Sequence, residues 1–249
     1  MTRHFPTIVV VLASTVVLLS AESLPSQLLD LSSWKLTLPT PGKNENSPRE
    51  IKQPDLQKFS DPLHFHVDPK ARAVVFRAPC GGTTTKGSSY PRSELREMSN
   101  KGRDRASWAT NDGFVHTMAL RVAITHTPKV KKHVVCAQIH DSGDDLMMIR
   151  LEGSHLFIER KPHEDVTLVR DYVLGTPFDV KIEASGSRVK VWHDGKKKMD
   201  WEVAREGCYF KAGCYTQSNP EKGDAAESYG EVAIHRLEIL HAPASIVED

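Results

Sequence analysis

Charge of one sign is not in excess in this chain, which has 249 residues, 33 Lys and Arg, 32 Asp and Glu, and a net charge of +1. General nucleic-acid binders and membrane-surface proteins usually carry a clear basic excess, so the balance argues against both classes. The overall charge balance does not exclude a local basic groove. The apolar content of 39% and the charged content of 26% are ordinary for a globular protein.

Long apolar runs are missing after the first twenty residues, and no later stretch approaches the ~18 apolar residues of a membrane-spanning helix. The early run covers residues 8–19, follows Arg3, and precedes the small residues Ala21 and Ser23. This pattern predicts a signal peptide over residues 1–23, with an uncleaved anchor or a buried helix as the alternative. We therefore expect a secreted, extracellular monomer without membrane contact after cleavage.

Cysteine is scarce, with only Cys80, Cys136, Cys208 and Cys214, and no C-x-x-C pair suggests a zinc site. In an oxidising compartment we expect disulfide bonds, and four cysteines permit three full pairings that the sequence does not distinguish. If residues 208–214 form an unbroken strand, its ends lie ~20 Å apart. A disulfide needs Cα atoms within about 7 Å, so a Cys208–Cys214 bond would require a bend or bulge.

Long amphipathic helices, internal repeats and low-complexity linkers are also missing. Short segments with period-two alternation take their place, and turn signals such as Asp194-Gly195 separate them. This pattern predicts an all-β, antiparallel sandwich or barrel that forms one domain over residues 24–249, with surface loops at 41–54 and 81–87. The predicted strands are 34–38, 63–67, 73–77, 90–98, 116–124, 134–140, 146–151, 155–160, 166–173, 178–183, 188–193, 196–201, 209–217 and 231–240.

The stretch 90–98 carries an unusual charge pattern for a strand. Arg92, Glu94 and Arg96 would stand on one face, because successive side chains of a strand alternate between two faces. Such a cation–anion–cation row suits binding of an acidic chain, with the carboxylate of Glu94 holding the guanidinium groups in place. Taken alone, the row is better explained as a solvated face laced with ion pairs, because charged side chains are usually exposed.

Two further strands present polar faces. Gln138 and His140 share one face of the strand 134–140, whereas Ala137 and Ile139 point toward the core. A single histidine on such a face is more often ordinary than catalytic.

The strand 209–217 separates its side chains more cleanly. One face is small and apolar, as a sheet-to-sheet core requires. On the other face, Gly213 is expected to leave room for a ligand to approach the backbone. The apolar face has Cys208, Phe210, Ala212, Cys214 and Thr216, and the other face has Tyr209, Lys211, Gly213, Tyr215 and Gln217.

Side by side on one sheet, these three faces would form a basic groove suited to a uronic-acid polysaccharide. Hydrolysis of a glycoside usually needs two carboxylates, and the three faces offer only Glu94. Elimination fits better: Arg92 and Gln138 would neutralise the uronate carboxylate and stabilise an enolate-like intermediate. His140 would remove the C5 proton and Tyr215 would protonate the departing O4. No metal, cofactor or G-x-S-x-G nucleophile is expected.

The motifs Arg92-Ser-Glu-Leu-Arg96, Gln138-Ile-His140 and Tyr209-Phe-Lys-Ala-Gly213, followed by Tyr215, resemble the three signature blocks of the polysaccharide lyase family 7 alginate lyases. The segments 34–39 and 231–237 resemble that family's first and last strands. The resemblance implies a β-jelly roll whose concave sheet binds alginate. It assigns Arg92, Gln138, His140 and Tyr215 to catalysis, and it assigns Glu94, Arg96, Lys211, Gln217 and Tyr209 to substrate binding.

The resemblance also implies that Tyr215 is the general acid, and with some substrates the base too, whereas His140 is the base for guluronate. Ile139 between Gln138 and His140 is associated with guluronate activity. We therefore expect an alginate lyase, and the expectation of an open groove adds endo action. The alternatives are a lyase for another polyuronate such as glucuronan, and a non-catalytic jelly roll that binds acidic polysaccharides. The presence of both His140 and Tyr215 disfavours the pure binder.

Overall fold

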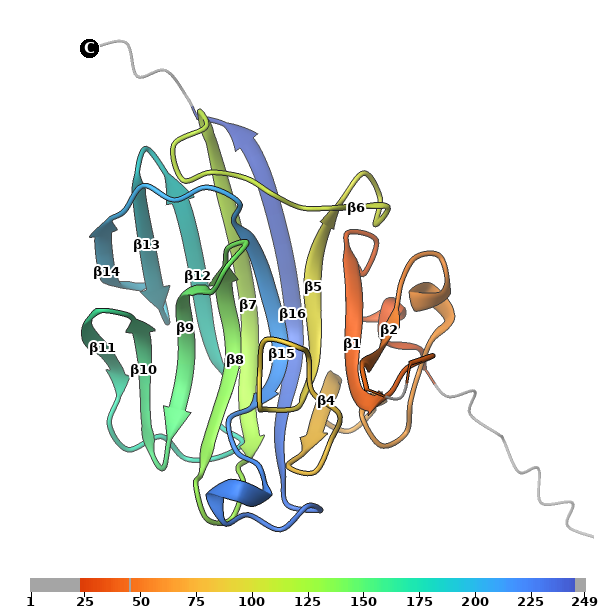
Figure 1. Ribbon diagram of the computed structural model, residues 1–249. Coiled ribbons are helices and arrows are strands. Elements are labelled where there is room, and N and C mark those ends of the chain that lie inside the picture. The colour runs from red at the N-terminus through yellow and green to blue at the C-terminus, as the bar shows by residue number, and fades with distance from the viewer. Residues whose placement is uncertain (1–22, 45, 245–249) are drawn as a thin grey trace, which may run out of the picture.

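The computed structural model describes residues 23–44 and 46–244. Except for Ser23, the predicted signal peptide lies outside these residues. The described chain consists of strands and short 3₁₀ turns, and its strands form two antiparallel sheets (Figure 1), which confirms the expected all-β sandwich. No helix in this part of the chain is both long and apolar enough to cross a membrane.

The first sheet, called here the site sheet, brings together strands that are far apart in the sequence. Its central members β8, β15, β5 and β1 pair in that order, so the three polar faces predicted from the sequence become neighbours. Along the sheet the strands are β11 (His163–Val169), β10 (His155–Arg160), β9 (Asp145–Glu152), β8 (His133–His140), β15 (Tyr209–Thr216), β5 (Arg92–Ser99), β1 (Trp34–Pro41) and β2 (Pro48–Ile51), with β6 (Asp104–Arg105) beside β5.

The second sheet packs against the inner face of the site sheet. Its order is β14 (Lys196–Glu202), β13 (Arg188–His193), β12 (Phe178–Ser185), β7 (Phe114–His126), β16 (Tyr229–Pro243), β4 (Ala73–Pro79) and β3 (Phe65–Asp68). The 3₁₀ turns are η1 (Pro25–Gln27), η2 (Asp55–Lys58) and η3 (Pro220–Lys222).

The core lies between the sheets and follows the alternation in the sequence. On the site sheet, Leu95, Ile139 and Phe210 are fully buried, and Leu120 and Ile182 meet them from the second sheet. Burial of each such side chain contributes roughly 1.5–3 kcal/mol. Because side chains alternate along a strand, burial of this set turns the polar set of β5, β8 and β15 to the outer face.

Two strand predictions need correction. Strand β2 lies inside the segment predicted as a loop at 41–54, where it pairs with β1 and buries only Ile51. One buried side chain produces no readable alternation, so backbone pairing with β1 decides this strand. Strand β11 spans His163–Val169 instead of the predicted 166–173, and its exposed first half pairs with β10 through its backbone. The Asp194-Gly195 turn joins β13 to β14 as predicted, with positive φ at both residues.

The expected disulfide bonds are absent, since all four cysteines are buried free thiols. Cys208 and Cys214 both point into the core, one just before β15 and one within it, so the extended chain keeps them apart. Burial raises the pKa of Cys80 to about 11 and the pKa values of Cys208 and Cys214 to about 12. Burial also raises the pKa of Cys136. Such thiols are poor nucleophiles and behave as small apolar side chains.

Candidate functional site

A cavity of about 280 Å³ lies on the outer face of the site sheet. Strand pairing explains why residues from separate motifs meet there: Lys211 is opposite both Arg96 and Gln138, Tyr215 is opposite Arg92, and Tyr209 is opposite His140. Seven of the nine predicted site residues line this cavity, namely Arg92, Arg96, Gln138, His140, Tyr209, Lys211 and Tyr215.

Glu94 lies beneath the cavity and is only 2% exposed. Its Oε2 is 3.1 Å from Arg92 Nη1 and 2.5 Å from Lys211 Nζ, and its Oε1 accepts a hydrogen bond from Gln138 Nε2. Burial opposes ionisation, but the charges of Lys211 and Arg92 outweigh it and hold the pKa of Glu94 below its usual value. Glu94 is thus a buried brace that orients three residues, whereas the sequence placed it on the groove surface.

Lys211 is the most strongly perturbed cation of the site. It is 6% exposed, and burial together with the nearby charge of Arg92 lowers its pKa to about 8, although Glu94 favours its charged form. At pH 7 Lys211 therefore carries a positive charge against the cavity floor, which favours an anionic ligand.

His140 is held in one tautomer by its surroundings. Its Nδ1 is 2.7 Å from the carbonyl oxygen of Asp141, to which it donates, so the lone pair resides on Nε2. The ring of Tyr209 stacks on the imidazole at 5.3 Å between centroids, and the guanidinium of Arg96 lies 3.8 Å from the Tyr209 ring centroid. Burial, followed by the charge of Lys211, lowers the pKa of His140. A neutral imidazole with a free Nε2 can act as a general base.

Tyr215 lines the cavity from the opposite end of β15 to Tyr209. Its ring lies 3.8 Å from the guanidinium carbon of Arg92, and its Oη is 2.9 Å from Ser88 Oγ. Burial raises the pKa of Tyr215, while Arg92 and the hydrogen bond with Ser88 act in the opposite direction. The phenol is therefore protonated at neutral pH and able to donate a proton.

Two predictions for the strand 209–217 do not match the structure. Gln217 does not line the cavity: it follows the end of β15 at Thr216 and is only 6% exposed. Gly213 does not make room for a ligand. A Cβ there would lie 2.7 Å from Ser93 O and 2.8 Å from the Glu94 Cα, and φ is +140°. The glycine is needed because β5 approaches closely at a register shift between β15 and β8.

Sequence reasoning missed the β1 edge of the cavity. At the β1 edge, Lys35 pairs in register with Arg96 and forms an ion pair with Glu50 of β2. Burial lowers the pKa of Lys35, which is 6% exposed. Alternation with the buried Trp34 and Leu36 would have put Lys35 on the site face, but only register with β5 shows that it extends the basic row.

The opposite edge is acidic. Asp144 and Asp145, at the start of β9, line the cavity near His140. Burial and the neighbouring Asp144 raise the pKa of Asp145 to about 6, so it is mostly ionised at pH 7. The cavity is therefore basic at the β1 edge and acidic at the β9 edge.

Among the described residues, no cluster of three or more His, Cys, Asp or Glu side chains is arranged to hold a metal ion. The acidic stretch 141–145 instead forms a turn, in which Asp141 Oδ1 accepts hydrogen bonds from the backbone N–H groups of Gly143 and Asp144.

Comparison with known proteins gives consistent matches. A family model described as alginate lyase matches residues 29–241. The solved structure of alginate lyase AlgAT5 from polysaccharide lyase family 7 is 53% identical, with a TM-score of 0.84 over 88% of this chain and 99% of that one. The structure of the alginate lyase from Corynebacterium sp. is 42% identical, with a TM-score of 0.83 over 89% and 99% of the two chains.

A curated alginate lyase of Klebsiella pneumoniae is 34% identical over 168 residues, which are 58% of this chain and 52% of the relative. The match thus spans about half the length of that relative.

Proposed function

This chain belongs to the alginate lyase family, and from that membership we propose that it cleaves the 1,4-linkages of alginate by β-elimination. The products would carry 4,5-unsaturated uronate ends. The observation that carries the proposal is the meeting of Arg92, Gln138, His140 and Tyr215 in one cavity above the buried Glu94. These residues supply the carboxylate clamp, the base and the acid that elimination requires.

The first task is to make the C5 proton removable. The adjacent carboxylate resists a second negative charge, so it must be neutralised before C5 loses a proton. Arg92 and the second N–H of the Gln138 amide are available for this, because Glu94 occupies only one donor of each. Lys211 adds positive charge beneath them. Glu94 fixes all three in advance, so they need little rearrangement when charge develops.

The second task is proton transfer. We propose that His140 Nε2 takes the C5 proton while the Tyr215 phenol gives its proton to O4, so that the C4–O4 bond breaks as the C4–C5 double bond forms. The lowered pKa of His140 keeps the base unprotonated down to more acidic pH, and the raised pKa of Tyr215 keeps the acid protonated to more alkaline pH. Activity should fall on the acid side as His140 gains a proton, at a pH below the ordinary histidine range, and on the alkaline side as Tyr215 loses one, at a pH above the ordinary tyrosine range.

Hydrolysis deserves a second test, because Glu50, Asp144 and Asp145 also line the cavity. Glu50 is ion-paired with Lys35, which lowers its pKa despite burial. Asp144 and Asp145 have pKa values shifted in opposite directions, as an acid–base pair would. However, they are adjacent in sequence at one edge, whereas a glycosidase places its carboxylates on opposite sides of the scissile bond. The arrangement favours elimination.

The polarity of the cavity suggests how the polymer lies. Lys35, Arg96, Lys211 and Gln138 stand in register across four neighbouring strands, which spans roughly 14 Å at ~4.8 Å per strand. We propose that alginate follows this row and extends past the β1 edge, away from the carboxylates of Asp144 and Asp145. Such an open path fits endo action.

The test is the absorbance at ~235 nm of the unsaturated product, measured on polymannuronate and polyguluronate separately. A rise with either polymer supports the proposal, and no rise with any alginate would refute it. The variant Tyr215→Phe should lose nearly all turnover and largely keep binding, since it retains the ring and loses only the transferable proton. Retained turnover would exclude Tyr215 as the acid.

Two alternative functions predict different results. A lyase for another polyuronate such as glucuronan would give unsaturated product from that polymer and none from alginate. A non-catalytic binder would retain alginate without product. The pairing of a neutral His140 and a protonated Tyr215 in one cavity disfavours the binder, which needs charge and aromatic surface but no acid–base pair.

We also propose that the protein is secreted after removal of residues 1–23 and acts as a monomer. Support for export comes from the apolar run at 8–19 after Arg3. N-terminal sequencing of the exported protein should begin at or near Leu24, and an intact Met1 would contradict the proposal. Size-exclusion chromatography with light scattering should give the mass of one chain.

A further inference from the structure

We propose that Ser88 is a positioning residue for Tyr215. The Ser88 hydroxyl accepts a hydrogen bond from the Tyr215 phenol before the proton is transferred and donates one to the Tyr215 oxygen afterwards. The inference rests on the proposed function, because it concerns the acid of that reaction. Ser88 lies in the loop between β4 and β5, outside the three motifs that indicated the site.

The hydrogen bonds of Ser88 place the resting proton. Its Oγ lies 3.2 Å from the carbonyl oxygen of Tyr90, 3.0 Å from the Tyr90 backbone nitrogen and 2.9 Å from Tyr215 Oη. A serine hydroxyl has one hydrogen and two lone pairs. If the hydrogen goes to the Tyr90 carbonyl, the lone pairs accept from the Tyr90 N–H and from the Tyr215 phenol. The hydrogen and both lone pairs of the Ser88 hydroxyl are then used. The phenol proton points to Ser88 until O4 of the substrate takes the place of Ser88 as its acceptor.

The same hydroxyl can serve the deprotonated state. When Tyr215 gives its proton to O4, the C4–O4 bond breaks and the phenolate is left with the neighbouring Arg92. The Ser88 hydrogen can then rotate from the Tyr90 carbonyl to the phenolate, while the Tyr90 N–H keeps the serine oxygen in place. The 3.2 Å bond to the carbonyl is the longest of the three and the least costly to give up. Water resets the site by returning a proton to Tyr215 and removing one from His140.

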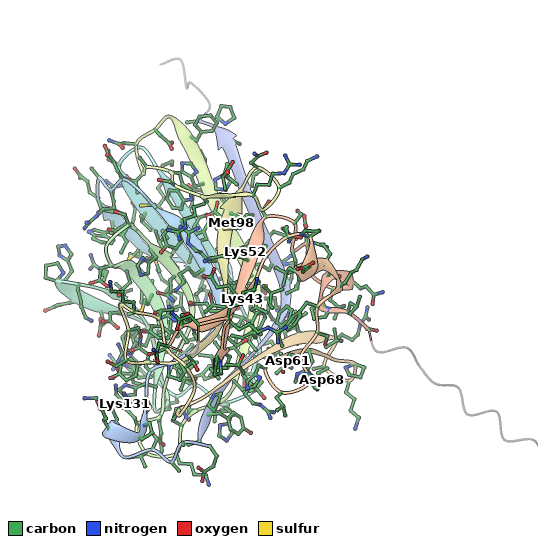
Figure 2. The ribbon with its side chains drawn as sticks, turned by 45° about the vertical axis from the view of Figure 1, so that its right-hand side comes forward. Lys43, Lys52, Asp61, Asp68, Met98 and Lys131 are labelled. Carbon is green, nitrogen blue, oxygen red and sulfur yellow. The ribbon has the colours of Figure 1, made fainter. Side chains whose placement is uncertain are left out.

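The loop is anchored so that Ser88 is already in position. The Ser88 N–H donates to Thr85 O at 3.0 Å, Thr84 forms a bridge with Pro91, and Asn219 Nδ2 donates to Ser89 O at 3.0 Å. Lys131 Nζ donates to the Tyr90 hydroxyl at 3.1 Å. Figure 2 shows Lys131 beside the η3 turn, where its backbone N–H is bonded to Asp224. A hydroxyl held from several sides can stabilise a developing charge without reorganisation.

The alternative is that the Ser88–Tyr215 bond only ties the loop to the sheet. The variant Ser88→Ala separates the two roles. For a positioning residue, kcat should fall about 10- to 100-fold, the loss expected for one hydrogen bond to a developing charge, while KM changes less than about threefold. Ser88→Thr keeps the hydroxyl and should restore most of kcat. The matched control is Ser89→Ala, which removes an exposed hydroxyl one residue away and keeps the carbonyl bonded to Asn219; it should leave kcat unchanged.

A second measurement needs no substrate. The hydrogen bond from Ser88 favours the phenolate, so Ser88→Ala should raise the pKa of Tyr215 further, by about half a unit to one unit. The ultraviolet titration of tyrosinate reports this shift once the curve of Tyr215→Phe is subtracted. The alkaline limb of the kcat/KM profile should move to higher pH by the same amount.

The outcomes distinguish the two proposals. If the wild type yields unsaturated product but Ser88→Ala keeps kcat and the phenol titration, or alters only KM and thermal stability, the role of Ser88 is refuted and the proposed function stands. A loss of kcat that Ser88→Thr does not recover, or that Ser89→Ala reproduces, also refutes it. If the wild type yields no product from any polyuronate, the proposed function fails and the catalytic role fails with it, whatever the titration shows.

Discussion

Removal of the charge on Glu94 is the most direct test of the buried brace. In Glu94→Gln the side chain keeps its shape and still accepts from Gln138, but Arg92 and Lys211 lose their shared anion. Arg92 cannot give up its proton, so it stays charged with one fewer charged hydrogen bond, at a cost of about 2 kcal/mol in the free energy of unfolding. We expect this part of the loss at every pH.

Lys211 responds differently, because it can lose its proton. Its pKa of about 8 in the wild type should fall below 7 once Glu94 no longer favours the charged form. A lysine pKa lowered by folding makes the unfolded chain bind more protons, so stability rises with pH between the folded and unfolded pKa values. Above pH 8 both proteins follow the same slope and their difference is constant. Below pH 8 only the variant keeps losing stability, by about 1.4 kcal/mol per pH unit.

Together these effects predict a destabilisation of about 2 kcal/mol at pH 9 and about 3 kcal/mol at pH 7. Urea denaturation at both pH values measures it, with the slope m as a check that the unfolded state is unchanged. The matched control is Asp179→Asn, since Asp179 also pairs with two cations, Arg121 at 2.7 Å and Arg236 at 3.2 Å, but is 38% exposed. Asp179→Asn should lower the free energy of unfolding by less than about 1 kcal/mol at either pH. A Glu94→Gln loss below about 1 kcal/mol, or one that shrinks as the pH falls, would refute the brace.

Two further variants test the acidic edge and the close strand approach. Folding raises the pKa of Asp145 to about 6, so the wild type loses stability as the pH rises through the range from about 4 to 6. Asp145→Asn should therefore be about 2 kcal/mol more stable at pH 8 and no more stable at pH 4 in thermal melts; equal stability at both would exclude a perturbed Asp145. Gly213→Ala should cost about 2 kcal/mol or more because of its positive φ and the contact with Ser93 O. Here a melting temperature equal to that of the wild type would count against the close approach.

The predictions that depend on period-two alternation held. The apolar set of 134–140 and 208–214 is buried and the polar set faces the cavity, because a strand turns neighbouring side chains to opposite faces whatever its partners are. The family resemblance came from the same motifs, and the family is shown by the match over residues 29–241. The catalytic roles of the residues remain predictions.

What the sequence by itself determined, then, is the all-β class and which side chains of Arg92–Arg96, Gln138–His140 and Tyr209–Tyr215 share a face. Only the tertiary structure decided how deeply each site residue is buried, the register in which the strands pair, and which residues far apart in the sequence are in contact. Pairing of β5 with β15, which in turn pairs with β8, brings Lys211 and Gln138 to Glu94 below the cavity, and pairing of β5 with β1 adds Lys35 to the basic row. A loop that shows no strand pattern brings Ser88 to Tyr215, 127 residues away. Local periodicity contains no information about such partners, because they are set by how whole strands and loops pack together.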